Sequence, residues 1–397
     1  MSFTEFSNSV TVSDAFRKLE CISKRYPPQS KTVNVSSLEP GRILAEDIEK
    51  DEEIPAVRAS TVHDFAATVN QLGTKRKFVG LSTAVTPYNA RLQLGECVRI
   101  TNGGVVPESA DTLVPFENIA LNDDDLKEEN IEFGNNSMEK SNIGEKRTDA
   151  KSGDVLLKEG HKLDSLSIRL LKTLEVEQVE IYKKPRVCVM SIENGHSQNK
   201  VHGNLNRFQL LALLQIHGFK AIDAGTSSNN SRKIKKALRV AANFACVVVI
   251  TGVDDHARRT LQKLDLKFEI ERVSSSPGDF SFAHGSVDDK PVLLCMLPQD
   301  LVSSWIGVSI FVLPLLRAME GREIKSNIRW KAILTKSIPM PTETTFISAR
   351  SEFIDGRLHS TPVNCEPLLG ANSILEVFAN ESYSAGDLID AIITEFI

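Results

Sequence analysis

The chain has little of what marks secreted, zinc-binding and membrane proteins. Its six cysteines, at positions 21, 97, 188, 246, 295 and 365, stand singly with no CxxC pair, so neither a disulfide framework nor a zinc site is indicated. The N-terminus lacks the basic and apolar regions of a signal peptide. The most apolar stretch, Leu301 to Leu316, contains Pro314 and is shorter than the ~20 residues needed to span a bilayer, which favours a buried helix. We therefore expect a cytoplasmic protein without a membrane span.

Strong charge of either sign is also absent. The net charge is −5, and only 6% of the residues are aromatic. A protein that binds nucleic acid broadly needs a basic face to displace counterions, so nucleic acid is not an expected partner. No GxSxG, HExxH or P-loop motif occurs, which removes three common enzyme classes. With 397 residues the chain is too long for one hydrophobic core, so several domains are expected.

The clearest pattern lies between residues 184 and 322, where short apolar runs alternate with helical ones. The predicted strands, each followed by a turn signal, are Arg186–Ile192, Phe219–Ala224, Cys246–Thr251 and Val292–Leu297. Helical patterns at Asn206–His217 and Ser231–Phe244 separate them. This alternation predicts an α/β domain with a parallel, doubly wound sheet. Ligands of such sheets bind at the carboxyl ends of the strands, so the loops there are the expected site.

The flanking regions have different patterns. Val12 to Ile22 predicts an amphipathic helix with Ser13 as its N-cap. Short alternating runs predict a β-rich subdomain near the N-terminus and another at the C-terminus, and the polar segment 121–151 predicts a loop. The predicted division is 1–46 with 142–183 as a linking subdomain, 47–141 as the β-rich subdomain, 184–322 as the α/β domain, and 323–397 as the C-terminal β subdomain.

Several stretches, in order, resemble the molybdopterin molybdenumtransferase family, which includes the E domain of gephyrin. The matching stretches are Gly41–Asp47, Arg99–Gly104 with Pro107–Asp111, Asn206-Arg207, Val247–Gly252, Ser276–Gly278 and Leu297–Ser303. The resemblance runs from about Val12 to Ile393. It implies four subdomains, an α/β domain that holds the pterin, and a homodimer.

Position by position, the family's site residues are altered. Its catalytic aspartate corresponds to His63 without gaps, or to Asp64 with one insertion and one deletion. This sequence differs from the family's site residues at His63, Asp64, Asn102, Asn194, Arg259, Ser276, Asp279 and Asp300. Asp149 keeps the family's aspartate, although its neighbours differ. A pterin phosphate and molybdate are anions, so acids at Asp254, Asp255, Asp279 and Asp300 would repel them. Two unit charges ~4 Å apart at an effective dielectric of 20 interact by about 4 kcal/mol.

These changes led to the prediction of a catalytically inactive protein with no cofactor. We expect a cytoplasmic, homodimeric scaffold that binds a peptide of a regulatory or membrane-associated protein, and that resembles the diverged gephyrin-like scaffolds of nematode development. In gephyrin, a phenylalanine that matches Phe16 anchors a receptor peptide, and Phe378 or Tyr383 would complete the groove. The alternative for Phe16 is core packing, since it lies on the apolar stripe.

Three clusters keep two interpretations each. His63, Asp64 and Asp149 are either an acid–base set or polar remnants on a loop. Asp254, Asp255 and His256 are either metal ligands or a helix N-cap. Asn102-Gly103-Gly104 is either an anion-binding loop or a turn. The competing function is an active molybdopterin molybdenumtransferase that uses Asp64 and Asp149, with magnesium, molybdopterin and molybdate.

Overall fold

The computed structural model describes residues 9–49, 60, 63–68, 75–116, 119, 130–132, 153–193, 205–324, 327–363 and 370–394. The chain divides into two compact units. The first comprises Met1–Glu46 with Gly160–Ile397, and the second comprises Asp47–Glu159. The sequence-based division ended the β-rich subdomain at residue 141 instead. Asp149 and Asn194 lie outside the described residues.

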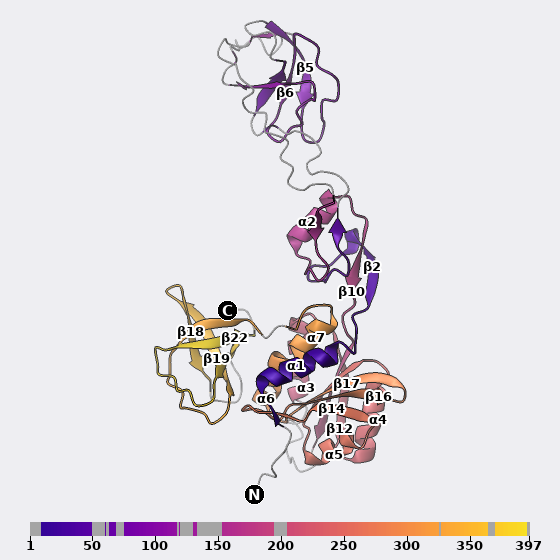
Figure 1. The fold of residues 1–397 in the computed structure, drawn as a ribbon, viewed down its shortest axis with the longest axis vertical. Helices are drawn as coiled ribbons and strands as arrows, with labels where there is room; N and C mark the ends of the chain where they lie inside the picture. The colour runs from indigo at the N-terminus through magenta and orange to yellow at the C-terminus, as the bar shows by residue number, and fades with distance from the viewer. Residues whose placement is uncertain are drawn as a thin grey trace. The chain divides into compact units, whose positions relative to one another are not determined.

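A six-stranded sheet forms the centre of the first unit (Figure 1). Its order is β12-β11-β13-β17-β16-β14. The strands are β11 (Val187–Glu193), β12 (Ala221–Ser228), β13 (Val247–Thr251), β14 (Leu266–Ile270), β16 (Ser281–Val287) and β17 (Lys290–Leu297). The first four strands in this order are parallel to one another, whereas β16 pairs antiparallel with both of its neighbours, β17 and β14. The predicted α/β fold class is confirmed, and the wholly parallel sheet is wrong because β14 and β16 add an antiparallel edge.

Both faces of this sheet are covered, which explains the near-continuous apolar strands. Alternate residues of β11 point to opposite cores: Val187 and Val189 to one, Cys188 and Met190 to the other. The first face carries α1 (Val12–Ser23), α3 (Leu205–Ile216), α6 (Leu301–Gly307) and α7 (Leu313–Met319). The second face carries α4 (Ser231–Ala242) and α5 (Asp255–Gln262).

Residues 301–319 form one continuous helical run with a π-helical segment, η4 (Val308–Val312), between α6 and α7. This run alone among the described residues is long and apolar enough to cross a membrane, and 78% of its most apolar stretch is buried within the protein. It is a core helix, as predicted. Pro314 has no N–H. The Ser309 carbonyl therefore lacks the donor that a π-helix would supply from residue i+5, and the Ile310 carbonyl lacks the donor that an α-helix would supply from residue i+4. The side-chain amide of Asn327 donates to both carbonyls instead, at 3.2 and 3.4 Å.

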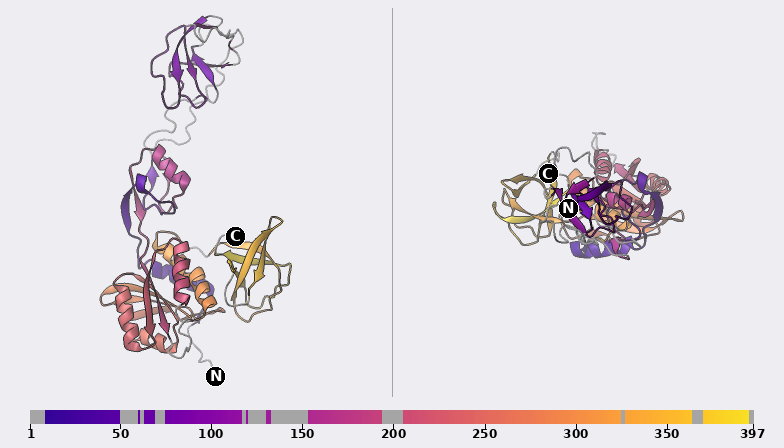
Figure 2. Two further views of the ribbon diagram at one scale, coloured as in Figure 1. Left: turned by 180° about the vertical axis from the view of Figure 1, so that it is seen from behind. Right: turned by 90° about the horizontal axis from the view of Figure 1, so that it is seen from above.

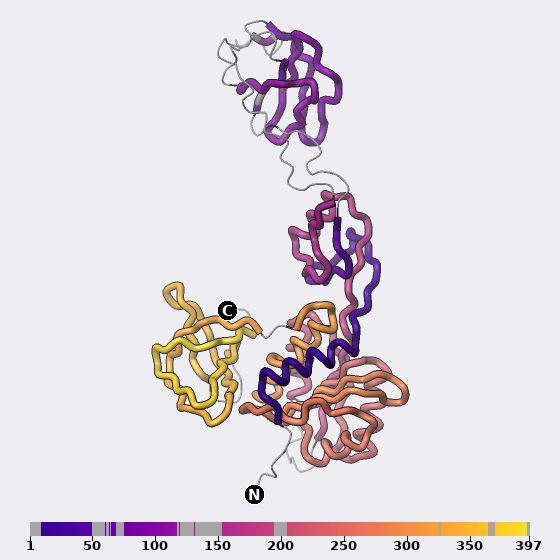
Figure 3. Tube along the Cα trace, viewed as in Figure 1, coloured from indigo at the N-terminus to yellow at the C-terminus, as the bar shows by residue number. Residues whose placement is uncertain are grey.

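The N-terminal helix α1 (Val12–Ser23) begins at Val12 as predicted, but its cap lies two residues before the predicted one. Thr11, not Ser13, is the N-cap, and its hydroxyl accepts from the Asp14 amide at 3.1 Å. Ahead of it, β1 (Ser9–Val10) pairs in parallel with β15 (Arg272–Val273). After it, β2 (Ser30–Asn34) pairs antiparallel with β10 (Gln178–Tyr182), so two segments far apart in sequence lie side by side (Figure 3). The linking region also holds η1 (Val35–Ser37) and α2 (Ser165–Thr173).

The C-terminal strands close into a barrel in the order β18-β20-β19-β21-β22 (Figure 2). They are β18 (Arg329–Leu334), β19 (Thr345–Ile354), β20 (Arg357–Pro362), β21 (Ser373–Val377) and β22 (Leu388–Ile393). The barrel has its own apolar core and packs on the α/β domain through Phe346, Ile374 and Ile392. Its contact with η4 includes an edge-on pair of Phe346 and Phe311, with centroids 6.4 Å apart.

The second unit is built on a five-stranded sheet of order β7-β4-β6-β5-β8. The strands are β4 (Asp64–Ala67), β5 (Lys75–Ser82), β6 (Glu96–Ile100), β7 (Thr112–Pro115) and β8 (Asn130–Glu132). Small cores cover both faces, with Phe65 and Cys97 in one and Ala66 and Val98 in the other. A separate pair joins β3 (Ile48–Glu49) to β9 (Val155–Leu157).

Candidate functional site

A buried arginine lies at the carboxyl end of the first two strands of the six-stranded sheet. Arg207, at the start of α3, is only 7% exposed. Its guanidinium pairs with Asp223 at 3.1 Å and donates to the Thr226 hydroxyl at 3.0 Å. Thr226 in turn shares a hydrogen bond with Ser191 at 2.8 Å. Sequence analysis missed this network, because the predicted strand ended at Ala224 and left Thr226 in a loop.

The carboxyl ends of the next two strands, β13 and β17, are joined by hydrogen bonds. The Thr251 hydroxyl donates to the Pro298 carbonyl at 3.0 Å, and the Ser304 hydroxyl donates to the same oxygen at 2.7 Å. Gly252 has φ +81°, and a Cβ there would lie 2.3 Å from the Ile192 carbonyl oxygen, so only glycine fits. The Asn206 side-chain amide donates to the Gln299 carbonyl. The Asn206-Arg207 pair therefore connects β12 to the loop after β17.

Three of the four acidic residues named for these loops have partners, whereas Asp255 is exposed in the first turn of α5. Asp254 is the N-cap of α5 and accepts from the Ala257 amide at 2.8 Å and from the Asn229 side chain at 2.6 Å. Asp300 is the N-cap of α6 and accepts from the Ser303 amide at 2.7 Å. Asp279 lies 3.6 Å from the Arg272 guanidinium. The N-cap interpretation holds for Asp254, and no group of three or more His, Cys, Asp or Glu that could hold a metal occurs in the described part of the chain.

This arrangement removes the physical basis for the predicted repulsion of anions. A carboxylate that accepts backbone N–H bonds at a helix N-terminus is balanced by the amides and the positive end of the helix dipole. The estimate of about 4 kcal/mol per charge pair assumes uncompensated charges. It does not apply to Asp254 or Asp300.

Two other altered positions have their contacts elsewhere. The backbone of Ser276 bridges to the barrel: its amide donates to Thr344 and its carbonyl accepts from Phe346, both at 2.8 Å. Arg259 is exposed on α5. Its neighbour Arg258, which sequence analysis passed over, donates to the Glu271 carbonyl at 2.7 Å and to the Ser281 hydroxyl at 2.6 Å.

In the second unit, His63 lies beside the Asn102-Gly103-Gly104 segment. This segment is a tight turn in which the Gly104 amide donates to the Thr101 carbonyl at 2.7 Å, and Gly103 has φ +77°. The Asn102 amide donates to His63 Nδ1 at 3.3 Å, and the Gly103 amide donates to the Ser60 carbonyl at 2.8 Å. Ser60 and His63 therefore both contact the turn. Asp64 is the first residue of β4, paired with Ile100 and Pro115.

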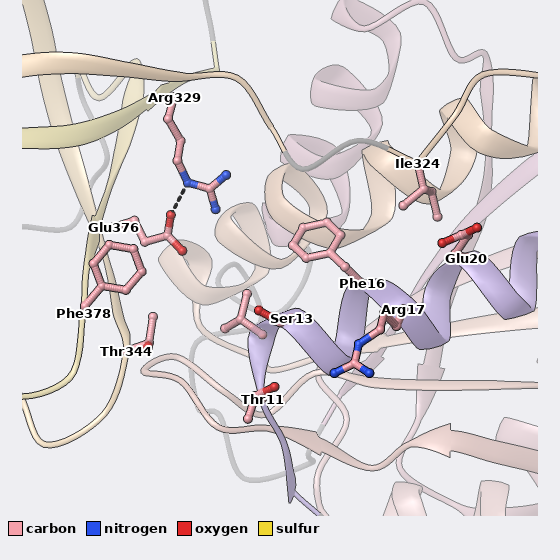
Figure 4. A pocket seen from close by; sticks show the side chains of 11 residues that line it. Thr11, Ser13, Phe16, Arg17, Glu20, Ile324, Arg329, Thr344, Glu376 and Phe378 are labelled. Atoms are coloured by element: carbon pink, nitrogen blue, oxygen red, sulfur yellow. Dashed lines mark hydrogen bonds and ion pairs between the residues drawn. The ribbon is translucent and has the colours of Figure 1, made fainter.

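A pocket of about 490 Å³ lies between α1 and the barrel (Figure 4). Phe16 and Ile324 line one side, and Arg329, Glu376 and Phe378 line the other (Figure 4). Arg329 and Glu376 form an ion pair across the strands. The Phe16 ring also packs on Phe311, with centroids 5.6 Å apart, so it belongs both to the core and to the pocket wall.

Tyr383 does not line this pocket. Its backbone pairs with Ile338, and its hydroxyl donates to Glu381 at 2.5 Å. Desolvation by burial, with the Glu381 hydrogen bond, raises the pKa of its phenol to about 12. The barrel residue that faces Phe16 is Phe378.

The sequence matches one family model and several curated proteins. The model of the MoeA N-terminal region (domain I and II) matches residues 10–174. The molybdopterin molybdenumtransferase of Haemophilus influenzae is 27% identical over 327 residues, which are 79% of this chain and 79% of that protein. The molybdopterin molybdenumtransferase of Bacillus subtilis is 24% identical over 358 residues, which are 85% of this chain and 82% of that protein.

Solved structures share the fold over almost the whole chain. The molybdopterin biosynthesis MoeA protein of Pyrococcus horikoshii superposes with a TM-score of 0.77 at 21% identity, covering 98% of this chain and 100% of that one. A molybdenum cofactor biosynthesis protein of Pyrococcus furiosus gives a TM-score of 0.57 at 16% identity, covering 97% and 100%.

These relatives overturn two predictions. The chain was expected to be no enzyme and to use no cofactor, whereas the curated relatives are named for an enzymatic reaction in which molybdenum is transferred to molybdopterin. Of the four loop acids on which those predictions rested, Asp254 and Asp300 are helix caps and Asp279 is an ion-pair partner. The homodimer, the scaffold role, the protein partner and the developmental role stay predictions. Residues 10–174 thus match the MoeA N-terminal region, about four fifths of the chain is similar to molybdopterin molybdenumtransferases, and the fold is that of MoeA proteins, in agreement with the family resemblance of the motifs.

Proposed function

We propose that this protein is a cytoplasmic molybdopterin molybdenumtransferase, an enzyme that transfers molybdenum, supplied as molybdate, to molybdopterin. The similarity to relatives of that name over about four fifths of the chain supports the reaction class. The observation that carries the proposal for this chain is that Asp254 and Asp300 act as helix caps, which leaves the strand-end loops able to receive an anion.

The strand-end edge gathers polar groups of the kind that such a substrate contacts. Arg207, which is paired with Asp223, lies there beside the Thr226 hydroxyl, and the hydroxyls of Ser191 and Thr251 lie at neighbouring strand ends. Gly252 allows close approach of the backbone where a side chain would collide with Ile192. Hydroxyls, backbone amides and an arginine are the groups that bind phosphate and oxyanions in other proteins.

His63 is the residue that we assign to proton transfer or oxyanion contact in the second unit. Because its Nδ1 accepts a hydrogen bond from the Asn102 amide, the neutral ring carries its proton on Nε2. The side chain is exposed, so that N–H can reach a substrate oxygen. The flanking turn holds the ring in this tautomer.

The test is a transfer assay with adenylylated molybdopterin and molybdate, in which molybdenum bound to the pterin product is measured. The wild-type protein is expected to turn over, and His63→Ala is expected to lose roughly 10²-fold in rate, as is typical of a positioned acid or base. His359→Ala in the barrel serves as the matched control, with an expected rate equal to wild type. Transfer no faster than in protein-free buffer would refute the assigned activity, and full activity of His63→Ala would refute the role of that residue.

We also propose a second function for the pocket between α1 and the barrel: it binds an extended peptide of a partner protein. Phe16 and Phe378 face each other across it, and the Arg329–Glu376 pair supplies polar contacts at its wall. An aromatic side chain in a groove is a common anchor of protein–protein recognition. A homodimer, which the family resemblance implies, belongs to the same proposal.

Quantitative pull-down with mass spectrometry tests the peptide pocket. Phe16→Ala and Phe378→Ala are expected to lose the same subset of captured proteins, by about tenfold or more, since loss of a hot-spot residue typically costs ≥ 2 kcal/mol. Phe353→Ala, which removes an exposed phenylalanine of β19 outside the pocket, is the control. If the two pocket variants capture the same proteins as Phe353→Ala, the pocket does not bind a partner.

A further inference from the structure

A second pocket, of about 210 Å³, lies where α3, the 301–319 helix and the barrel meet. Its volume equals that of about seven water molecules at liquid density. Five of its ten lining residues are apolar: Leu313, Ile328, Trp330, Ile392 and Ile393. Its polar lining residues are His217, Ser309, Arg317, Asn327 and Thr394. It lies at the end of α3, whereas the strand-end site described above lies at the start of α3.

Three of the polar groups are buried and have no hydrogen-bond partner among the residues that the structure describes. They are the hydroxyls of Ser309 and Thr394 and the Nε2 atom of His217. Ser309 is 4% exposed and Thr394 is 7% exposed. Buried polar atoms in native proteins almost always have a partner, and leaving one unmade costs roughly 1–3 kcal/mol. Three such atoms around one cavity indicate that something polar is bound there.

Arg317 gives this pocket its charge. In the described part of the chain, its guanidinium makes no hydrogen bond or ion pair. Burial, together with the nearby Arg322, lowers its pKa, and Glu320 acts in the opposite direction. Arginine keeps its charge in proteins, so it can form a paired, two-point contact with a carboxylate.

The π-helical segment holds the pocket in shape. Pro314 prevents the regular bonds to Ser309 and Ile310, the helix widens at Val308–Val312, and Asn327 binds the two carbonyls. Asn327 immediately precedes Ile328, which with Trp330 forms the exposed edge of the pocket, at 77% and 52% exposure. The same local distortion therefore positions Ser309 and the apolar rim.

We propose that this pocket binds a small monocarboxylate with an apolar body, whose carboxylate contacts Arg317, Ser309 and Thr394 and whose hydrocarbon part lies against Trp330, Ile392 and Leu313. One guanidinium balances one negative charge. A phosphate dianion would need a second cation, and His217 does not supply one at neutral pH because burial and Arg317 lower its pKa. Water alone would satisfy the hydroxyls but would leave the apolar wall and the arginine without a complementary partner.

The experiment uses the full-length protein and hexanoate as the probe, with hexanamide as its neutral match. Binding is measured by saturation-transfer NMR of the ligand methyl group and by the fluorescence of Trp330, one of only two tryptophans in the chain. Hexanoate is expected to bind saturably and at least tenfold more tightly than hexanamide. Trp330→Phe should remove the fluorescence change, which assigns it to the pocket.

Three substitutions then test the contacts. Arg317→Gln is expected to weaken hexanoate binding roughly tenfold or more, since hydrogen bonds to charged groups are the stronger class. Ser309→Ala and Thr394→Val change little volume and are each expected to weaken it several-fold with the fold intact. Lys220→Gln, which removes an exposed positive charge outside the pocket, is the control with unchanged binding.

Each outcome decides the proposal. It is overturned if hexanoate does not bind saturably to the wild-type protein, if hexanamide binds equally well, or if Arg317→Gln and Lys220→Gln behave alike. Hydroxyl substitutions that leave affinity unchanged in folded protein would show that water alone occupies the polar end. Melting temperatures of all variants separate loss of binding from loss of fold.

Discussion

Asp254 and Glu320 are two carboxylates whose effects depend on their partners and not on their charge alone. Asp254 accepts hydrogen bonds from a backbone amide and from an asparagine side chain, so its charge stabilises the start of α5. Glu320 is 3% exposed at the end of α7, and its Oε1 atom has no hydrogen-bond partner within the described parts of the chain. Desolvation by burial raises its pKa, although Lys184, Arg322, Arg42 and Lys162 act in the opposite direction.

Glu320→Gln is therefore expected to stabilise the protein at neutral pH. A carboxyl whose pKa is raised by folding favours the folded state when it is protonated, and that contribution is lost as pH rises through the folded-state pKa. Thermal unfolding of both proteins is measured from pH 4 to pH 7. The wild type and Glu320→Gln should have equal melting temperatures near pH 4, and the variant should have the higher melting temperature at pH 7. If the melting temperature of the wild type rises relative to that of the variant as pH rises, the four cations outweigh burial in their effect on the pKa of Glu320.

At the scale of elements, the 301–319 helix is shaped by one proline. Pro314 leaves Ser309 and Ile310 with carbonyls that no helical N–H can reach, and the side chain of Asn327 replaces the missing donors from outside the helix. Asn327 is two residues before β18, so this contact also fixes how the chain enters the barrel.

Asn327→Ala is expected to destabilise the protein by roughly 1–3 kcal/mol, since it leaves two buried carbonyls without donors. The loss should be smaller when Pro314→Ala is also present, because an alanine N–H can bond the helix carbonyls directly. Chemical denaturation of the wild type, both single variants and the double variant gives the coupling energy. Additive effects would show that Asn327 does not substitute for the donor that Pro314 lacks.

The whole molecule consists of two units with separate cores. Ile100 belongs to the core of the unit formed by Asp47–Glu159, and Leu294 belongs to the sheet core of the other unit. Both are fully buried. Units that do not share a core can unfold in separate transitions, whereas a single cooperative domain cannot.

Calorimetry is expected to resolve two transitions. Ile100→Ala should lower the free energy of unfolding for one transition, and Leu294→Ala should lower it for the other. Each loss should be about 2–5 kcal/mol, as for other large-to-small core substitutions. Valine in place of either residue provides a milder control with a smaller shift of the same transition. If both alanine variants shift every transition equally, the chain unfolds as one cooperative unit.

The sequence by itself determined the elements whose burial is visible in local pattern. Strands such as Val247–Thr251 are buried at every position and almost wholly apolar because both sheet faces are covered, and helices such as Ser231–Ala242 have one apolar face. The order of short motifs also indicated the family correctly. These features depend on residues close together in the chain, where periodicity and turn chemistry act.

Only the tertiary structure decided what the polar residues do. Asp254 and Asp300 looked like charges that repel an anion, but folding places backbone amides against them. Phe16 looked like either core or pocket, and contacts with Phe311 and the barrel make it both. The Arg207 network and the Arg317 pocket escaped the sequence analysis for the same reason. Their partners are far apart in the chain, and the energy of a polar group depends on its neighbours in space.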